Sequence, residues 1–186
     1  MGKAATHIVQ LLRHPNSGWT PARELDVEVI RLGSVLSLRF AVRGDVAQIS
    51  MPPARVPARV DGLWQHTCFE AFVRGAASSD RYWEFNLSPS RHWAAYRFDH
   101  YREGMAPEPA AADPQIEILS DDRLLRLSAE LDLSAITALR AHDAWQLGLS
   151  AVIEDRDGGK SWWALAHLSE SPDFHRSDSF TLRLAP

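Results

Sequence analysis

The 186-residue sequence contains a single cysteine, Cys68. One cysteine excludes an intrachain disulfide, and it excludes a metal centre built from several thiolates of the same chain. Cys68 lies within an apolar run that includes Phe69 and Phe72. That setting favours a buried, unreactive thiol over a catalytic nucleophile.

The sequence also lacks an excess of positive charge. It has 20 lysines and arginines against 24 aspartates and glutamates, for a formal net charge of -4. The arginines are scattered along the chain, so no basic stripe for nucleic acid is expected. No apolar run reaches membrane-spanning length, and the first fifteen residues do not have the pattern of a signal peptide. We therefore expect no membrane partner and a cytoplasmic location.

Motifs of catalysis are missing as well. The sequence has no Gly-x-Ser-x-Gly elbow, no phosphate-binding glycine loop before a helix and no His-Glu-x-x-His pattern. Glu70 and Glu84 are the pair that could act as acid and base, as in a glycosidase. We expect them instead to be hydrogen-bonded or solvated strand carboxylates, and we expect the protein not to be an enzyme.

Metal-binding patterns are weak. No two of the eight histidines form a His-x-His pair, which would point two imidazoles to the same side of a strand. The segment 155–159, Asp-Arg-Asp-Gly-Gly, has the oxygen-bearing residues of a calcium loop but lacks the later glutamate of an EF-hand. A hairpin turn is the favoured interpretation. No cofactor is expected, and calcium binding stays open.

Alternating apolar and polar residues are the most prominent pattern in the sequence. Residues 125–132, Leu-Arg-Leu-Ser-Ala-Glu-Leu-Asp, alternate strictly, as in a strand with one buried face. Further runs of this type, or rich in aromatic and β-branched residues, predict strands at 35–42, 67–74, 81–88, 92–98, 115–119, 145–153 and 179–184. With 45% hydrophobic and 24% charged residues, the chain can form a packed core.

Only residues 134–140 have a helical pattern, about two turns long, with Asp132 or Ser134 as the N-cap. Many strands with one short helix predict an all-β fold, an antiparallel two-sheet β-sandwich of the jelly-roll or immunoglobulin-like kind. We expect one domain over residues 1–186. Long loops at 51–66, 99–114, 154–160 and 167–178 are where a functional site is expected.

The sequence is rich in tryptophan, with seven residues of this type. A flat indole ring can pack in a core, and it can also stack on the apolar face of a sugar ring. Trp64 is a candidate for the second role because it ends a proline-rich loop and precedes polar Gln65 and His66. Glu70, Arg91 and Trp162 or Trp163 add the carboxylate, guanidinium and second indole that a sugar site uses.

The segments 63–72 and 82–90 carry a resemblance to a known family. Their sequences are Leu-Trp-Gln-His-Thr-Cys-Phe-Glu-Ala-Phe and Tyr-Trp-Glu-Phe-Asn-Leu-Ser-Pro-Ser. They resemble bacterial DOMON-like proteins related to family-nine carbohydrate-binding modules, and the resemblance continues through 93–105 and 163–175. It implies a β-sandwich that binds its ligand at a concave face or a loop rim.

The resemblance also implies roles for particular residues. In the sugar-binding modules, two tryptophans clamp a terminal sugar while a glutamate and an arginine bind its hydroxyls. Trp64 and Glu70 resemble the first tryptophan and the glutamate, and Arg91 resembles the arginine. Trp163 would be the second tryptophan, with Trp162 facing the opposite side of a strand. The resulting hypothesis is a non-catalytic module for a small saccharide or sugar-like metabolite.

Two other functions remain open. Some DOMON domains bind haem, for which Met51 or Met105 would pair with His66 or His92, although no haem-attachment motif is present. Alternatively, the aromatic segments build the core of a structural or protein-interaction module without a small ligand. The sequence leaves the oligomeric state undetermined.

Overall fold

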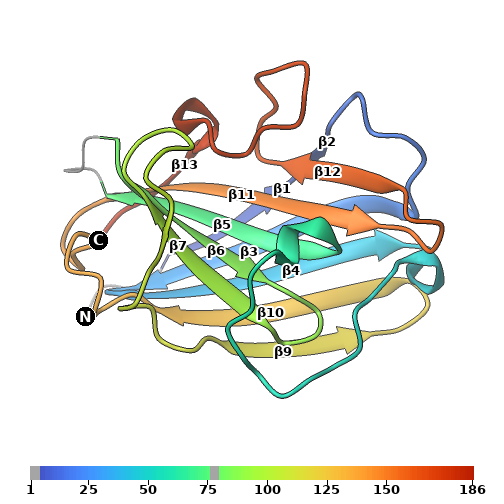
Figure 1. The fold of residues 1–186 in the computed structure, drawn as a ribbon, viewed down its shortest axis with the longest axis horizontal. Helices are drawn as coiled ribbons and strands as arrows, with labels where there is room; N and C mark the ends of the chain where they lie inside the picture. The colour runs from blue at the N-terminus through green and yellow to red at the C-terminus, as the bar shows by residue number, and fades with distance from the viewer. Residues whose placement is uncertain (1–4, 76–79) are drawn as a thin grey trace.

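A computed structural model gives the structure of residues 5–75 and 80–186. The chain forms two antiparallel β-sheets that pack as a sandwich, as the sequence predicts (Figure 1). The five-stranded sheet has the order β1 (Thr6–Gln10), β3 (Ala22–Leu32), β4 (Val35–Gly44), β10 (Leu124–Asp132) and β9 (Gln115–Ser120). The eight-stranded sheet has the order β2 (Leu12–Arg13), β12 (Lys160–Ala164), β11 (Trp145–Glu154), β5 (Cys68–Gly75), β6 (Tyr82–Leu87), β7 (Trp93–Phe98) and β8 (Ala106–Pro107), with β13 (Leu182–Leu184) paired to β11.

The main core lies between the two sheets and follows the alternation of the strands. On β10 the buried side chains include Leu125 and Leu127, and Leu127 is aligned with Phe40 of β4. On the facing sheet Phe69 and Leu149 belong to the same cluster. Since alternate residues of a strand point to opposite faces, each strand contributes every second side chain to this core.

The outer face of the eight-stranded sheet is also largely covered. Every residue of β6 and nearly all of β5 and β7 are buried, although only alternate ones face the main core. The remaining side chains form a second cluster, in which Phe72, Tyr82, Tyr96 and Phe98 pack with Phe180. The covering segments include the 3₁₀ turn η2 (Leu63–Gln65) and the chain between β12 and β13. Groups on this face are therefore shielded from water, which sets the electrostatics of the site described below.

The short helix expected at 134–140 does not form. Within residues 5–75 and 80–186, the helical segments are the 3₁₀ turns η1 (Val46–Gln48), η2 and η3 (Ser177–Ser179). Residues 133–143 make consecutive turns with i to i+3 hydrogen bonds, which bury Leu133, Ile136 and Leu139. The guanidinium of Arg31 donates to the carbonyl oxygens of 140, 141 and 143, so these carbonyls are held by a distant side chain instead of a helix ladder.

Several local predictions can be compared with the structure directly. Cys68 is buried, as expected. Residues 155–159 form the hairpin turn between β11 and β12, where Oδ1 of Asp155 accepts hydrogen bonds from the backbone amides of Asp157 and Gly159 at 2.9 and 2.8 Å. The eleven-residue strand β3 was not among the predicted strands. No helix in the described part of the chain has the length and apolar character needed to cross a bilayer.

Candidate functional site

A pocket of about 360 Å³ lies on the outer face of the eight-stranded sheet. Its floor comes from strands and its rim from loops. The sheet contributes Glu70 of β5, Glu84 of β6, Phe98 of β7, Val152 of β11 and Trp162 of β12. The rim consists of Trp64, Arg102, Met105, Pro172, Phe174 and His175.

The rim joins three segments that are far apart in the sequence. Trp64 belongs to the loop at 51–66, Arg102 and Met105 to the loop at 99–114, and Phe174 and His175 to the loop at 167–178. These are three of the long loops in which a site was expected. The sheet brings them together because β5, β7 and β12, which begin or end at these loops, belong to the same layer.

Glu70 is one of two buried carboxylates in the pocket, and only 2% of the residue is exposed. It is aligned with Ser150 of β11, whose hydroxyl donates a hydrogen bond of 2.7 Å to Oε2. Burial raises the pKa of Glu70 to about 8, and the nearby charge of Glu84 adds to the increase. The carboxyl group is therefore poised to gain or lose a proton near neutral pH.

Glu84 is the second buried carboxylate, with 5% of the residue exposed. Nδ2 of Asn86 donates a hydrogen bond of 2.7 Å to its Oε1. Asn86 is aligned with Glu70 across β5 and β6, so Glu70 and Glu84 are diagonal neighbours on the same face. Burial raises the pKa of Glu84 to about 7, while Asn86 and Arg102 reduce the shift.

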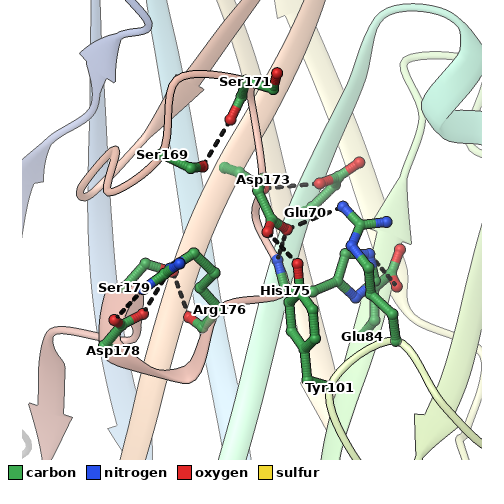
Figure 2. Close-up of polar contacts among 12 residues, drawn as sticks. Glu70, Glu84, Tyr101, Ser169, Ser171, Asp173, His175, Arg176, Asp178 and Ser179 are labelled. Carbon is green, nitrogen blue, oxygen red and sulfur yellow. Dashed lines mark hydrogen bonds and ion pairs between the residues drawn. The ribbon is translucent and has the colours of Figure 1, made fainter.

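Arg102 is the arginine that lines the pocket, and it is bound to Asp173. Its guanidinium donates a hydrogen bond of 2.9 Å to Oδ1 of Asp173. The hydroxyl of Tyr101 donates to Oδ2 of the same carboxylate (Figure 2). Although burial opposes the effect, these hydrogen bonds hold the pKa of Asp173 below its ordinary value. The ion pair ties the loop at 99–114 to the loop at 167–178 over the sheet.

His175 lies beside Glu84, as Figure 2 shows. Its Nδ1 is 2.8 Å from the hydroxyl of Tyr82, and its Nε2 is 3.9 Å from Oε2 of Glu84. The ring packs edge-on against Phe72 and Phe98. Burial, with a smaller effect from Arg102, lowers the pKa of His175 to about 4. The imidazole is therefore neutral at physiological pH.

Aromatic side chains form the apolar part of the lining. Trp64 is 38% exposed and packs edge-on against Tyr96, with 5.9 Å between ring centroids. Trp162 lines the same pocket from β12, together with Phe98 and Phe174. The backbone of Trp162 is fixed on both sides, since its amide donates to Oγ of Ser17 and its carbonyl accepts from the amide of His14.

The five predicted binding residues have different positions in the structure. Trp64, Glu70 and Trp162 line the same pocket. Trp163 lies in the main core, 4% exposed, with Nε1 donating to Oγ of Ser161 at 3.0 Å. Arg91 is exposed in the turn between β6 and β7, at φ 71°, and does not line the pocket. Of the two tryptophans named from the sequence, Trp162 lines this pocket and Trp163 does not, and the arginine in its lining is Arg102.

The residues considered as haem ligands lie in different places, since His66 and His92 line a second pocket that does not include Met105. Across 5–75 and 80–186 there is no group of three or more His, Cys, Asp and Glu side chains arranged to hold a metal ion. Met105 lines the pocket, 49% exposed. His66 is bound to Glu154 instead, with Nδ1 at 2.8 Å from Oε2.

Sequence reasoning missed Phe98, Arg102, Phe174 and His175. One sequence signal for this face was available, because β5, β6 and β7 are nearly continuous apolar runs, typical of strands covered on both faces. A glutamate within such a run has to be buried. The loop residues have no comparable signal, since their place over the sheet depends on contacts between distant segments.

No protein-family model and no curated protein sequence matches the chain. Among solved structures, it is similar to one named "a putative carbohydrate-binding protein" from Bacteroides uniformis. The TM-score is 0.65 with 13% sequence identity, over 95% of this chain and 84% of that chain. At this identity the similarity shows a shared fold.

Proposed function

We propose that the protein is a non-catalytic binding module for a small saccharide, which it holds in the pocket over the eight-stranded sheet. The observation that carries this proposal is the composition of the lining. Two partly exposed indoles, from Trp64 and Trp162, share one pocket with the buried carboxylates Glu70 and Glu84 and with Arg102. Aromatic walls with a few fixed polar groups are the combination that orients a small polyhydroxylated ligand.

In this proposal each part of the pocket contacts a different part of the sugar. An indole face of Trp64 or Trp162 stacks on the C–H groups of the ring. Carboxylate oxygens of Glu70 and Glu84 accept hydrogen bonds from hydroxyl groups, and the guanidinium of Arg102 donates to them. Because Ser150 and Asn86 already fix the carboxylates, little side-chain entropy is lost on binding.

Two further facts support a saccharide. The structurally similar protein from Bacteroides uniformis is named for carbohydrate binding. The sequence resemblance to DOMON-like proteins related to family-nine carbohydrate-binding modules implies the same ligand class for Trp64 and Glu70. The resemblance and the pocket agree on these two residues, although they differ on the arginine and on the second tryptophan.

The test is a titration of the protein with mono- and oligosaccharides, followed by tryptophan fluorescence and by calorimetry. We expect saturable binding of one class of sugar, and loss of that binding in Trp64→Ala and in Trp162→Ala with the fold retained. Trp19→Ala is the matched control, because Trp19 is 67% exposed and does not line the pocket. It should bind as the wild type does.

Two results would contradict the proposal. Failure to bind any sugar of the panel is the first, and binding that is unchanged in both pocket variants is the second. Either result would leave the structural or protein-interaction module as the better account of the fold.

A further inference from the structure

The charged groups of the pocket indicate which kind of saccharide it binds. An inference about the kind of saccharide rests on the proposed function. Glu70 and Glu84 each use one carboxylate oxygen for a hydrogen bond, to Ser150 and to Asn86. Within the described residues, Oε1 of Glu70 has no hydrogen-bond partner. Oε2 of Glu84 lies 3.9 Å from Nε2 of His175, which is beyond hydrogen-bond distance. Each glutamate thus has one carboxyl oxygen available to a ligand in the pocket.

The cations nearest these carboxylates do not neutralise them. Arg102 lines the pocket, but its guanidinium is hydrogen-bonded to the carboxylate of Asp173 at 2.9 Å. That pair has no net charge. His175 is partly buried and is neutral at physiological pH, because burial lowers its pKa to about 4.

Arg74 and Lys160 are cations on this face, but neither lines the pocket. Burial raises the pKa of Tyr82 to about 12 and also raises the pKa of Tyr96, so both phenols stay neutral. Cys68, beneath the carboxylates on β5, is a buried thiol whose pKa lies well above its ordinary value. At the edge of the face, the ring of His66 is paired with the carboxylate of Glu154. Among the described residues that line the pocket, the only cation is therefore Arg102, which Glu84 shares with Asp173.

The aromatic lining fits a cationic ligand as well as a sugar ring. The faces of tryptophan and phenylalanine rings carry partial negative charge and attract ammonium groups. Trp64, Trp162, Phe98 and Phe174 surround the carboxylates in the same pocket. A ligand with both a pyranose ring and an ammonium group would use the stacking surfaces and the buried carboxylates together.

We propose that the saccharide bound in this pocket is an amino sugar with a free, protonated amine, whose ammonium group lies between the unpaired carboxylate oxygens of Glu70 and Glu84. The amine donates hydrogen bonds to both carboxylates and supplies a counter-ion for them. Binding ionises the carboxylates, so protons leave the protein as the ligand enters. A neutral sugar of the same shape would leave the carboxyl groups largely protonated and would form no ion pair with them.

The test compares matched sugars by calorimetry. Glucosamine, galactosamine and mannosamine are each titrated against the parent hexose and the N-acetyl derivative, which has the same ring without the charge. We expect at least one free amine to bind about ten-fold tighter than both neutral forms, as a charge-assisted hydrogen bond would provide. Binding should also release protons, seen as a dependence of the heat on the buffer. EDTA in all samples excludes binding of a divalent cation.

Two glutamine variants and the measurement of proton release test the inference independently of each other. Glu70→Gln and Glu84→Gln should each lose most of the preference for the amine while keeping weak binding of the neutral sugar, with folding checked by far-ultraviolet circular dichroism. If either variant fails to fold, proton release by the wild-type protein carries the test. Equal or tighter binding of neutral sugars, still dependent on Trp64, would overturn the amino-sugar inference and leave the proposed function intact. Binding of no sugar at all would overturn both.

Discussion

The hydroxyl oxygen of Tyr82 lies 2.8 Å from Nδ1 of His175. The same oxygen accepts a hydrogen bond of 3.2 Å from the backbone amide of Arg102. The hydroxyl proton is therefore free to point to Nδ1, which accepts it when the neutral imidazole carries its own proton on Nε2. In this arrangement the Nε2–H faces the side of the pocket that holds Glu84.

Replacing Tyr82 by phenylalanine removes the donor and leaves Nδ1 of His175 buried without a partner. We expect Tyr82→Phe to lower the free energy of unfolding by about 1–3 kcal/mol. Urea denaturation measures the loss, and the nitrogen chemical shifts of His175 report its tautomer. Tyr101→Phe is the control, because Tyr101 is 52% exposed and its loss should cost less. Equal stability of Tyr82→Phe and the wild type would contradict this role of the hydroxyl.

The unliganded protein should lose stability as the pH rises from about 6.5 to about 8.5. Glu70 and Glu84 have pKa values of about 8 and about 7 in the folded state, against 4.5 as the ordinary value. The folded state holds more protons in this interval, so the stabilisation present at low pH is lost as the pH rises through the folded values. His175 makes the stability rise with pH, because its pKa is lowered in the folded state. This effect is confined to pH values below its ordinary pKa of 6.5.

This pH dependence can be measured by urea denaturation at a series of pH values. We expect a decrease of at least about 1 kcal/mol across the interval, since each pKa unit corresponds to about 1.4 kcal/mol. The double variant Glu70→Gln, Glu84→Gln should show a flatter profile. A wild-type stability that stays flat in this range would mean that the two carboxyl groups are already ionised in the folded protein.

Trp162 and Trp163 are adjacent in sequence but should respond in opposite ways to truncation. Trp163 is 4% exposed in the main core, so Trp163→Ala should lower the free energy of unfolding by about 3–5 kcal/mol. Trp162→Ala should cost clearly less stability and should remove the binding of the ligand. Denaturation measures the stability of the two variants, and calorimetry measures their binding. Loss of binding in Trp163→Ala with little loss of stability would show that Trp163, and not Trp162, holds the ligand.

Arg31 should be essential for stability because its guanidinium lies 3.5 Å from the centroid of a Trp145 ring and donates to six carbonyl oxygens. Arg31→Met leaves these acceptors without donors and should cost at least about 3 kcal/mol of unfolding free energy. Arg31→Lys should be intermediate, since an ammonium group cannot reproduce the planar arrangement of donors. Arg39→Met is the exposed control, as its ion pair with Glu28 is on the surface. Similar losses in the Arg31→Met and Arg39→Met variants would contradict the role given to Arg31.

The sequence by itself determined the fold class, an all-β sandwich, and the position of most long strands, although it did not reveal β3 or the order of the strands. Apolar residues at every second position, as in Leu125 and Leu127, can be buried together only in an extended strand, so the pattern specifies strands and their core-facing side. The same reasoning predicted that Cys68 is buried. It also predicted the long loops at 51–66, 99–114 and 167–178, which supply the rim of the pocket. These properties depend on neighbours in the chain, which the sequence displays directly.

Only the tertiary structure decided which side chains share the pocket. Arg102 and Asp173 are 71 positions apart, and they meet because two loops cross the same sheet face. The segment 134–140, predicted as a helix, forms turns, and Arg31, more than 100 positions away in the sequence, binds the carbonyl groups at its end. Strand periodicity places Trp162 and Trp163 on opposite faces, but which face is the core depends on the register with β11 and on the packing of the second sheet.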